Sequence, residues 1–184
     1  MNVKSFVANI KMRQLKKQME PHDFVFPTAV QNPKHVLVCL PSGLRELTLV
    51  KQFLPAITEL FKPAEIVLLS MPGIKVTDIF PRKGFQILSP SADQLSWSGL
   101  AKKTYISQFK ELKIDVVLDL NLQSSSFTSS ILLNFPEALR IGRGNHRGNP
   151  YYNLEIKTKY LRDERNIYRT ILDTISIMRN QKVA

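Results

Sequence analysis

The chain has 184 residues, of which 43% are hydrophobic and 22% are charged. This length and composition fit one globular domain with a single core, and they exclude wholesale disorder because core-forming residues are not depleted. The formal net charge is +11, from 26 Lys and Arg against 15 Asp and Glu. Such an excess permits an anionic partner but does not choose among nucleic acid, phosphorylated lipid and phosphosugar.

Cysteine, histidine and hydropathy exclude several further classes. The single cysteine, Cys39, cannot form an internal disulfide, which suits a reducing cytosol. The histidines His22, His35 and His146 are scattered, so we expect neither a metal site nor a catalytic triad, and no cofactor. No apolar run approaches the roughly 20 residues of a membrane-spanning helix, and residues 1–20 carry no export signal. The sequence therefore predicts a cytoplasmic protein.

The first predicted element in chain order is a basic helix within residues 1–20, which hold five basic residues and one acid. Phe6, Ile10 and Met12 fall on one side of it and the lysines elsewhere, as in an amphipathic helix. Its basic face is either simply solvated or docked peripherally on the inner face of the cytoplasmic membrane. We expect no nucleic acid, because aromatic residues do not interleave with basic ones as a stacking platform requires.

Pro21, Pro27 and Pro33 then interrupt the helical pattern. We therefore divide the chain into a basic N-terminal helix with a proline-rich connector, residues 1–34, and a domain that spans residues 35–184. Within that domain, short apolar runs typical of buried strands alternate with helical spacing. The predicted strands lie at residues 35–40, 65–70, 85–89, 114–120 and 138–142.

Helical patterns fill the segments between and after these strands. They cover residues 47–61, a short segment between the second and third strands, residues 95–112, residues 127–135 and residues 167–178. The alternation predicts an α/β fold: a three-layer, Rossmann-like, mostly parallel sheet with helices on both faces, forming a single domain. Ligands of such sheets bind outside the carboxyl ends of the strands, so the loops at that edge form the candidate functional rim.

The loop after the first strand, PSGLRE, lacks the glycine patterns that bind dinucleotides or nucleotide phosphates. It carries Ser42, Arg45 and Glu46 at a helix N-terminus, where backbone amides favour anions. We therefore place Ser42 and Arg45 among the candidate substrate-binding residues. In a second interpretation, Ser42 caps the helix and Glu46 complements its dipole.

The loop RIGRGNHRGN, after the fifth strand, gathers Arg140, Arg143, His146 and Arg147 among glycines. Guanidinium groups bind phosphate bidentately, and glycines let a backbone approach closely, so this loop predicts an acidic saccharide or a lipid phosphate as ligand. Its charge alternatively serves only to solvate the loop. Asp119 ends the fourth strand and faces the same edge. It is either a ligand-binding acid or an acid that caps the strand end or pairs with a nearby Arg.

Three stretches follow one another in an order typical of a known family. They are HVLVCLPSGLRELTLVKQFLPAITEL, KPAEIVLLSMPG and KELKIDVVLDLNLQSSSFTSSILLNFPEALRIGRGNHRG. Together they resemble the N-terminal domain of glycosyltransferase family nine, the bacterial ADP-heptose:lipopolysaccharide heptosyltransferases. The likeness spans roughly residues 35–178.

The resemblance implies one half of a GT-B glycosyltransferase, namely the half that binds the acceptor. A second Rossmann-like domain binds the nucleotide sugar in that family, and this chain has no room for it. The family's inverting, metal-independent transfer uses as general base an Asp that directly follows a Gly. Arg45 and Glu46 stand at these positions here, so Glu46 is the candidate base, with a carboxylate displaced by about 1 Å by its extra methylene. Asp119 matches the family's Asp at the end of the fourth strand.

Two functions from different classes follow. The first is an acceptor-binding domain for cell-envelope polysaccharide or lipopolysaccharide synthesis, an enzyme only when a partner polypeptide completes it with a nucleotide-sugar site. The second is a non-catalytic scaffold on the same fold, whose former interdomain surface serves self-association or a protein partner. The substitution of the Gly-Asp pair by Arg45 and Glu46 favours the scaffold, and the truncation favours the half-enzyme.

Overall fold

The computed structural model describes residues 3–20, 22–80, 84–144 and 150–181. Within these ranges the strands form one sheet in the order β3-β2-β1-β4-β5-β6, and every pairing is parallel. Their bounds are β1 (His35–Cys39), β2 (Glu65–Leu69), β3 (Gln86–Leu88), β4 (Val116–Asp119), β5 (Leu139–Arg143) and β6 (Leu154–Ile156). This order is that of a Rossmann fold, which confirms the predicted α/β class.

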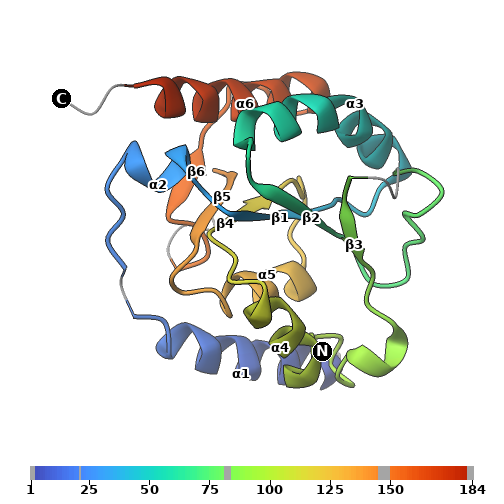
Figure 1. The fold of residues 1–184 in the computed structure, drawn as a ribbon. Helices are drawn as coiled ribbons and strands as arrows, with labels where there is room; N and C mark the ends of the chain where they lie inside the picture. The colour runs from blue at the N-terminus through green and yellow to red at the C-terminus, as the bar shows by residue number, and fades with distance from the viewer. Residues whose placement is uncertain (1–2, 21, 81–83, 145–149, 182–184) are drawn as a thin grey trace.

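Helices cover both faces of the sheet (Figure 1). α3 (Leu44–Phe61) and α6 (Glu164–Asn180) lie on one face, and α4 (Lys103–Glu111) and α5 (Ser126–Leu132) lie on the other. The alternation of side chains along β1 explains both layers: Val36 and Val38 belong to the core beneath α3 and α6, while Leu37 and Cys39 belong to the core against α4 and α5. A strand buried on both sides reads as a continuous apolar run, as the sequence indicated.

The predicted apolar faces of the two long helices are confirmed. Leu47, Val50, Leu54, Ile57 and Phe61 of α3 are buried, as are Ile167, Ile171, Leu172 and Ile175 of α6. α6 starts where the Asp163 carboxylate accepts a hydrogen bond from the Asn166 amide at 3.1 Å, an N-cap that satisfies one of the unpaired amides of the first turn.

Several elements differ from the sequence prediction. β6 was missed because its three residues, with Glu155 between two apolar ones, form no apolar run, and α2 (Thr28–Gln31) because it is a single turn within the connector. The helix predicted over residues 95–112 starts only at Lys103, because Gly99 adopts φ +79° in a tight turn at residues 96–100. The described residues between β2 and β3 form turns rather than a short helix.

The first helix, α1 (Val3–Lys17), packs differently from its predicted amphipathic pattern. Ala8 and Met12 are buried against Leu100 and Leu133, whereas Phe6 and Ile10 are exposed. Placing Met12 on the same side as Phe6 was therefore wrong, since the packed side of the helix is the one centred on Ala8 and Met12. The division of the chain at residue 34 stays a prediction.

None of the helices in the described part of the chain combines the length and the apolar character that crossing a bilayer requires.

Gly142 in β5 gives a direct test of this packing. A Cβ at this position would overlap the ring of Tyr152, so we expect Gly142→Ala to lower the free energy of unfolding by about 1–3 kcal/mol through overpacking. Urea unfolding measures the change. Gly144→Ala is the matched control, because its Cβ would come close to the flexible Lys157 side chain, at 3.0 Å, and would otherwise make ordinary contacts at 3.6 Å. Equal stability of the two variants would contradict the packing described.

Candidate functional site

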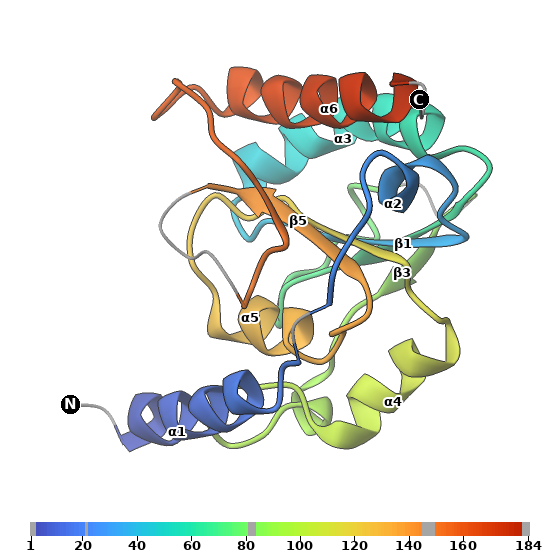
Figure 2. The same cartoon turned by 90° about the vertical axis from the view of Figure 1, so that its left-hand side faces the viewer.

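The carboxyl edge of the sheet has one place where the chain connections diverge. β1 lies between β2 and β4, and Cys39 is the register partner of Asp119 at the carboxyl ends of β1 and β4. From there the chain leaves β1 towards α3 on one face and β4 towards α5 on the other (Figure 2). In open sheets of this order the ligand crevice lies at such a switch point, which makes it the candidate site.

Asp119 lies at the centre of this site and is 1% exposed. Its Oδ1 accepts hydrogen bonds from the backbone N–H of Asn121 at 3.0 Å and from Asn121 Nδ2 at 2.7 Å. Its Oδ2 accepts one from the Tyr152 hydroxyl at 2.6 Å. Both carboxylate oxygens therefore accept hydrogen bonds from the chain itself. The role of Asp119 in binding substrate stays a prediction.

The Glu46 carboxylate lies in the first turn of α3. Its Oε2 accepts a hydrogen bond from the Gly43 backbone N–H at 3.2 Å, so it reaches back to the N-cap residue as an acid at this helix position often does. Ser42 is exposed and is not the cap, because the helix begins at Leu44 with Gly43 as its N-cap. The interpretation of Ser42 as a cap is therefore wrong. Ser42 as a ligand-binding residue and Glu46 as a general base stay predictions.

Arg45 points away from the sheet and pairs with the start of α6. Its guanidinium lies 2.9 Å from the Glu164 carboxylate, and the Arg45 side chain is 79% exposed against 21% for Glu164. An open hollow of about 790 Å³ lies between these two helix N-termini. It is lined by Leu44, Arg45, Thr48, Leu49, Asp163, Glu164 and Arg165.

Arg143 ends β5 and contributes a half-buried cation to the same edge. Its Nη2 donates to the Tyr160 carbonyl at 2.9 Å. Nearby, the buried Tyr168 hydroxyl donates to the Leu120 carbonyl at 3.1 Å. Burial raises the pKa of Tyr168, and the negative charges of Glu46, Glu164 and Asp119 raise it further, while Arg143 lowers it. The Tyr168 phenol is thus surrounded by charged side chains from four elements, β4, β5, α3 and α6.

Sequence reasoning missed both tyrosines of this site. Tyr168 follows Ile167 in the apolar stripe of α6, and the sequence does not indicate that its hydroxyl donates to a buried carbonyl. Tyr152 lies before a strand that was not predicted. A buried tyrosine normally finds a hydrogen-bond partner, so a tyrosine within a strongly apolar pattern was the signal available.

Arg140 does not take part in the rim, although it was grouped with the basic loop. It is 2% exposed, and burial lowers its pKa to about 10. Its guanidinium donates to the carbonyls of Phe135, Pro136, Ala138, Pro150 and Tyr151. The predicted phosphate-binding role is therefore corrected for Arg140, because its donors are directed to two loops of the chain itself. His146 and Arg147 lie outside the described residues.

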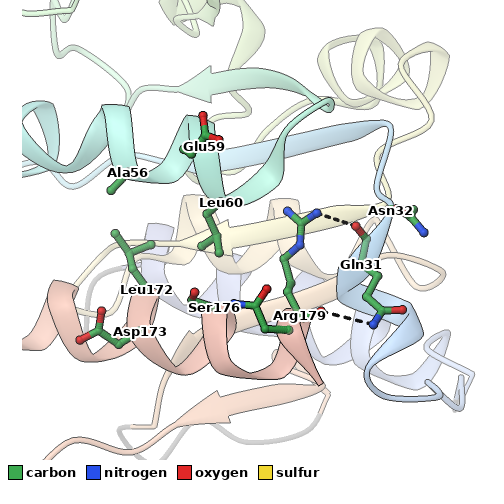
Figure 3. A pocket seen from close by; sticks show the side chains of 10 residues that line it. Gln31, Asn32, Ala56, Glu59, Leu60, Leu172, Asp173, Ser176 and Arg179 are labelled. Atoms are coloured by element: carbon green, nitrogen blue, oxygen red, sulfur yellow. Dashed lines mark hydrogen bonds between the residues drawn. The ribbon is translucent and has the colours of Figure 1, made fainter. Parts of the chain in front are cut away.

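Another hollow, of about 690 Å³, lies between α2, α3 and α6 (Figure 3). Arg179 projects into it and donates to the Gln31 carbonyl at 2.6 Å, and Gln31 Nε2 donates back to the Arg179 carbonyl at 3.3 Å. The hollow is lined by the last turns of α3, which lead into the start of β2. It therefore lies at the amino edge of the sheet, away from the switch point. In the described ranges no cluster of three or more His, Cys, Asp or Glu side chains is arranged to hold a metal ion.

The sequence matches no protein-family profile and no curated protein. In fold, the chain is similar to the E. coli heptosyltransferase WaaC with ADP, with a TM-score of 0.54 and 12% identity over 80% of this chain and 48% of that chain. WaaC with ADP-2-deoxy-2-fluoro heptose gives a TM-score of 0.48 and 12% identity over 82% and 50%. The chain thus spans about half the length of the enzyme it matches.

At this identity the likeness concerns the fold. The parallel sheet and its switch point define a single Rossmann-like domain. More particularly, this fold is similar to about half of a heptosyltransferase chain.

The Asp119–Tyr152 hydrogen bond is testable by a pair of tyrosine variants. Tyr152→Phe keeps the ring but leaves a buried carboxylate with one donor fewer, so we expect the free energy of unfolding to fall by about 1–3 kcal/mol. Tyr105→Phe is the matched control, because the Tyr105 hydroxyl is buried and has no hydrogen-bond partner among the described residues. That variant should be neutral or slightly stabilising in the same urea titration. A neutral Tyr152→Phe would show that the contact contributes nothing.

The Cys39 thiol should not react with thiol reagents in the native protein. Burial raises the pKa of its thiol, and the charge of Asp119 raises it further, so the thiolate fraction at mildly alkaline pH is smaller than for an ordinary cysteine. We expect the disulfide reagent DTNB to label this single thiol only after unfolding in denaturant. Immediate stoichiometric labelling of the native chain would contradict the burial of Cys39.

Proposed function

We propose that this chain is the acceptor-binding, N-terminal-type half of a heptosyltransferase-like glycosyltransferase. The observation that carries the proposal is the fold likeness to about half of a heptosyltransferase, which extends over 80% of this chain. On this proposal the ligand is an anionic saccharide of the cell envelope, such as a lipopolysaccharide core or its lipid-phosphate-bearing precursor. A separate nucleotide-sugar domain on a partner protein would complete the site and hold ADP-heptose or another ADP-sugar, and this chain alone would transfer nothing.

The cations of the carboxyl edge support an anionic ligand. Arg45 is the exposed member of its ion pair and lies beside the hollow between α3 and α6, whereas its partner Glu164 is the more buried one. An ion pair whose cation is this exposed contributes little to stability, so a phosphate can replace Glu164 as the partner of Arg45 at small cost. Arg143 is held by the Tyr160 carbonyl through Nη2, which orients its guanidinium at the end of β5.

The acids of the edge support a second candidate, a scaffold without catalysis. Glu46 accepts from the Gly43 amide, Asp119 accepts from Asn121 and Tyr152, and Glu164 pairs with Arg45. A general base at Glu46 would have to accept the proton on Oε1 or give up the hydrogen bond from Gly43 to Oε2. On the scaffold interpretation, the surface that would face a nucleotide-sugar domain instead binds a protein partner or a second copy of the chain.

Calorimetric titration separates the two candidates. We expect a phosphorylated lipopolysaccharide core saccharide to bind and an ADP-sugar not to bind. Arg45→Ala with Arg143→Ala should weaken saccharide binding by roughly tenfold or more through loss of charge-assisted hydrogen bonds, and high salt should shrink the difference. Lys51→Ala with Arg169→Ala removes the same charge from exposed positions of α3 and α6 and should leave the affinity within about threefold.

The other outcomes each reject a specific part of the proposal. Binding of the ADP-sugar would mean that the chain is the donor half. Absence of heat in both titrations would favour the scaffold. Glu46→Gln should leave saccharide affinity nearly intact and abolish transfer once a donor half is supplied, and undiminished transfer would remove Glu46 from the role of base.

A further inference from the structure

α1 is fixed to the rest of the molecule by one side only. Ala8 and Met12 are buried against Leu100 and Leu133, and Leu15 and Met19 pack partly against the same cluster. Next to this contact, the Lys16 ammonium lies 4.4 Å from the centre of the Tyr151 ring, a cation–π contact. These contacts determine which side of the helix faces outward.

The outward side carries an apolar stripe followed by cations. Val3, Phe6 and Ile10 are 64%, 49% and 41% exposed, and their spacing of three and four residues places them on one face. Arg13 and Lys17 continue the same face by the same spacing and are exposed. We call these five residues the outer face of α1. A soluble helix normally directs its apolar stripe at the core, whereas this helix has a second apolar stripe directed at solvent.

The charge of α1 restricts what covers this stripe. The helix holds five basic residues and no acid, and all five are exposed. A second copy of the chain would bring an equally cationic helix against it, and the two would repel. Anionic lipid headgroups complement the cations while the apolar side chains enter the acyl boundary, the combination typical of helices that lie in a membrane interface.

The position of α1 in the fold is compatible with contact to a flat surface. In both views α1 is an outermost element on the α4 and α5 side of the sheet, and its axis runs along that side of the molecule (Figure 1, Figure 2). The turn at residues 96–100 is on the same side, since its Leu100 packs on Ala8 and Met12. This turn exposes Trp97 by 61%, and tryptophan is enriched at membrane–water interfaces.

We propose that the outer face of α1 docks the protein on the anionic surface of a lipid bilayer, with Trp97 beside the contact. α1 lies in the plane of the interface, its apolar stripe enters the headgroup region, and its cations pair with lipid phosphates. This inference does not depend on what the carboxyl edge of the sheet binds, because α1 lies outside the switch-point site.

Vesicle sedimentation of the full chain tests the docking. Phosphatidylcholine vesicles that contain phosphatidylglycerol should bind the protein, pure phosphatidylcholine vesicles should not, and high salt should release it. Phe6→Gln with Ile10→Gln should weaken the partition by roughly tenfold or more, and Arg13→Gln with Lys17→Gln by about 30-fold.

Matched variants control for general hydrophobicity and charge. Leu161 and Ile177 are 81% and 63% exposed elsewhere on the surface, so Leu161→Gln with Ile177→Gln removes comparable apolar area, and Lys51→Gln with Arg169→Gln removes two exposed cations. Both control variants should bind the anionic vesicles as the unmodified chain does. Thermal unfolding of all four double variants checks that each is folded.

Trp97, the single tryptophan of the chain, reports which side contacts the lipid. Energy transfer from Trp97 to a dansyl-labelled lipid headgroup should be strong in the bound protein. Absence of binding to the anionic vesicles, binding without energy transfer, or equal binding of the outer-face variants would each overturn the proposal. So would a dimer in vesicle-free solution that Phe6→Gln with Ile10→Gln dissociates, because a second copy would then cover the stripe.

Discussion

The carboxylate of Asp119 is buried at the carboxyl end of β4, at the switch point of the sheet. The arrangement of the whole carboxyl edge depends on the hydrogen bonds that this charge accepts. A buried carboxylate is tolerated only when hydrogen bonds replace the water it loses. Asn121 supplies two of these from the turn after β4, and Tyr152 supplies another from the segment that leads into β6. One side chain therefore links the centre of the sheet to the segment before β6, a three-residue strand at one edge of the sheet.

A second buried charge, the Arg140 guanidinium, binds the same segment before β6. Arg140 donates to the carbonyls of Pro150 and Tyr151, and its own backbone N–H donates to Asn153 Oδ1 at 3.0 Å. Tyr152, between them, packs against Gly142, where any larger residue would collide with its ring. The segment at residues 150–153 is thus held by an anion, a cation and a close contact. Because Asp119 and Arg140 serve this purpose, the proposed binding of an anion depends on the exposed Arg45 and the half-buried Arg143.

The sequence predicted the elements whose periodicity covers several turns or a whole buried strand. β1, β2 and β4, and the apolar faces of α3 and α6, follow from patterns that both core layers enforce. β6 has no apolar run, α2 is a single turn, and the turn around Gly99 interrupts a helical pattern that otherwise continues into α4. The side chains of the site were harder still. Arg140 and Arg143 are three residues apart in β5, so they lie on opposite faces of the sheet. One is enclosed by carbonyls and the other reaches the edge, because each meets a different loop.

Together, the two proposals define how the ligand site is oriented relative to the membrane. α1 lies along the side of the molecule formed by α4 and α5, and the sheet forms the layer between these helices and α3 with α6 (Figure 2). A surface that contacts α1 therefore runs alongside the sheet rather than across its end. The carboxyl edge then opens sideways, along the membrane and not away from it. A saccharide anchored in the same leaflet by a lipid would approach that edge laterally, so docking through α1 would replace a three-dimensional search for such an acceptor by diffusion in the plane of the bilayer.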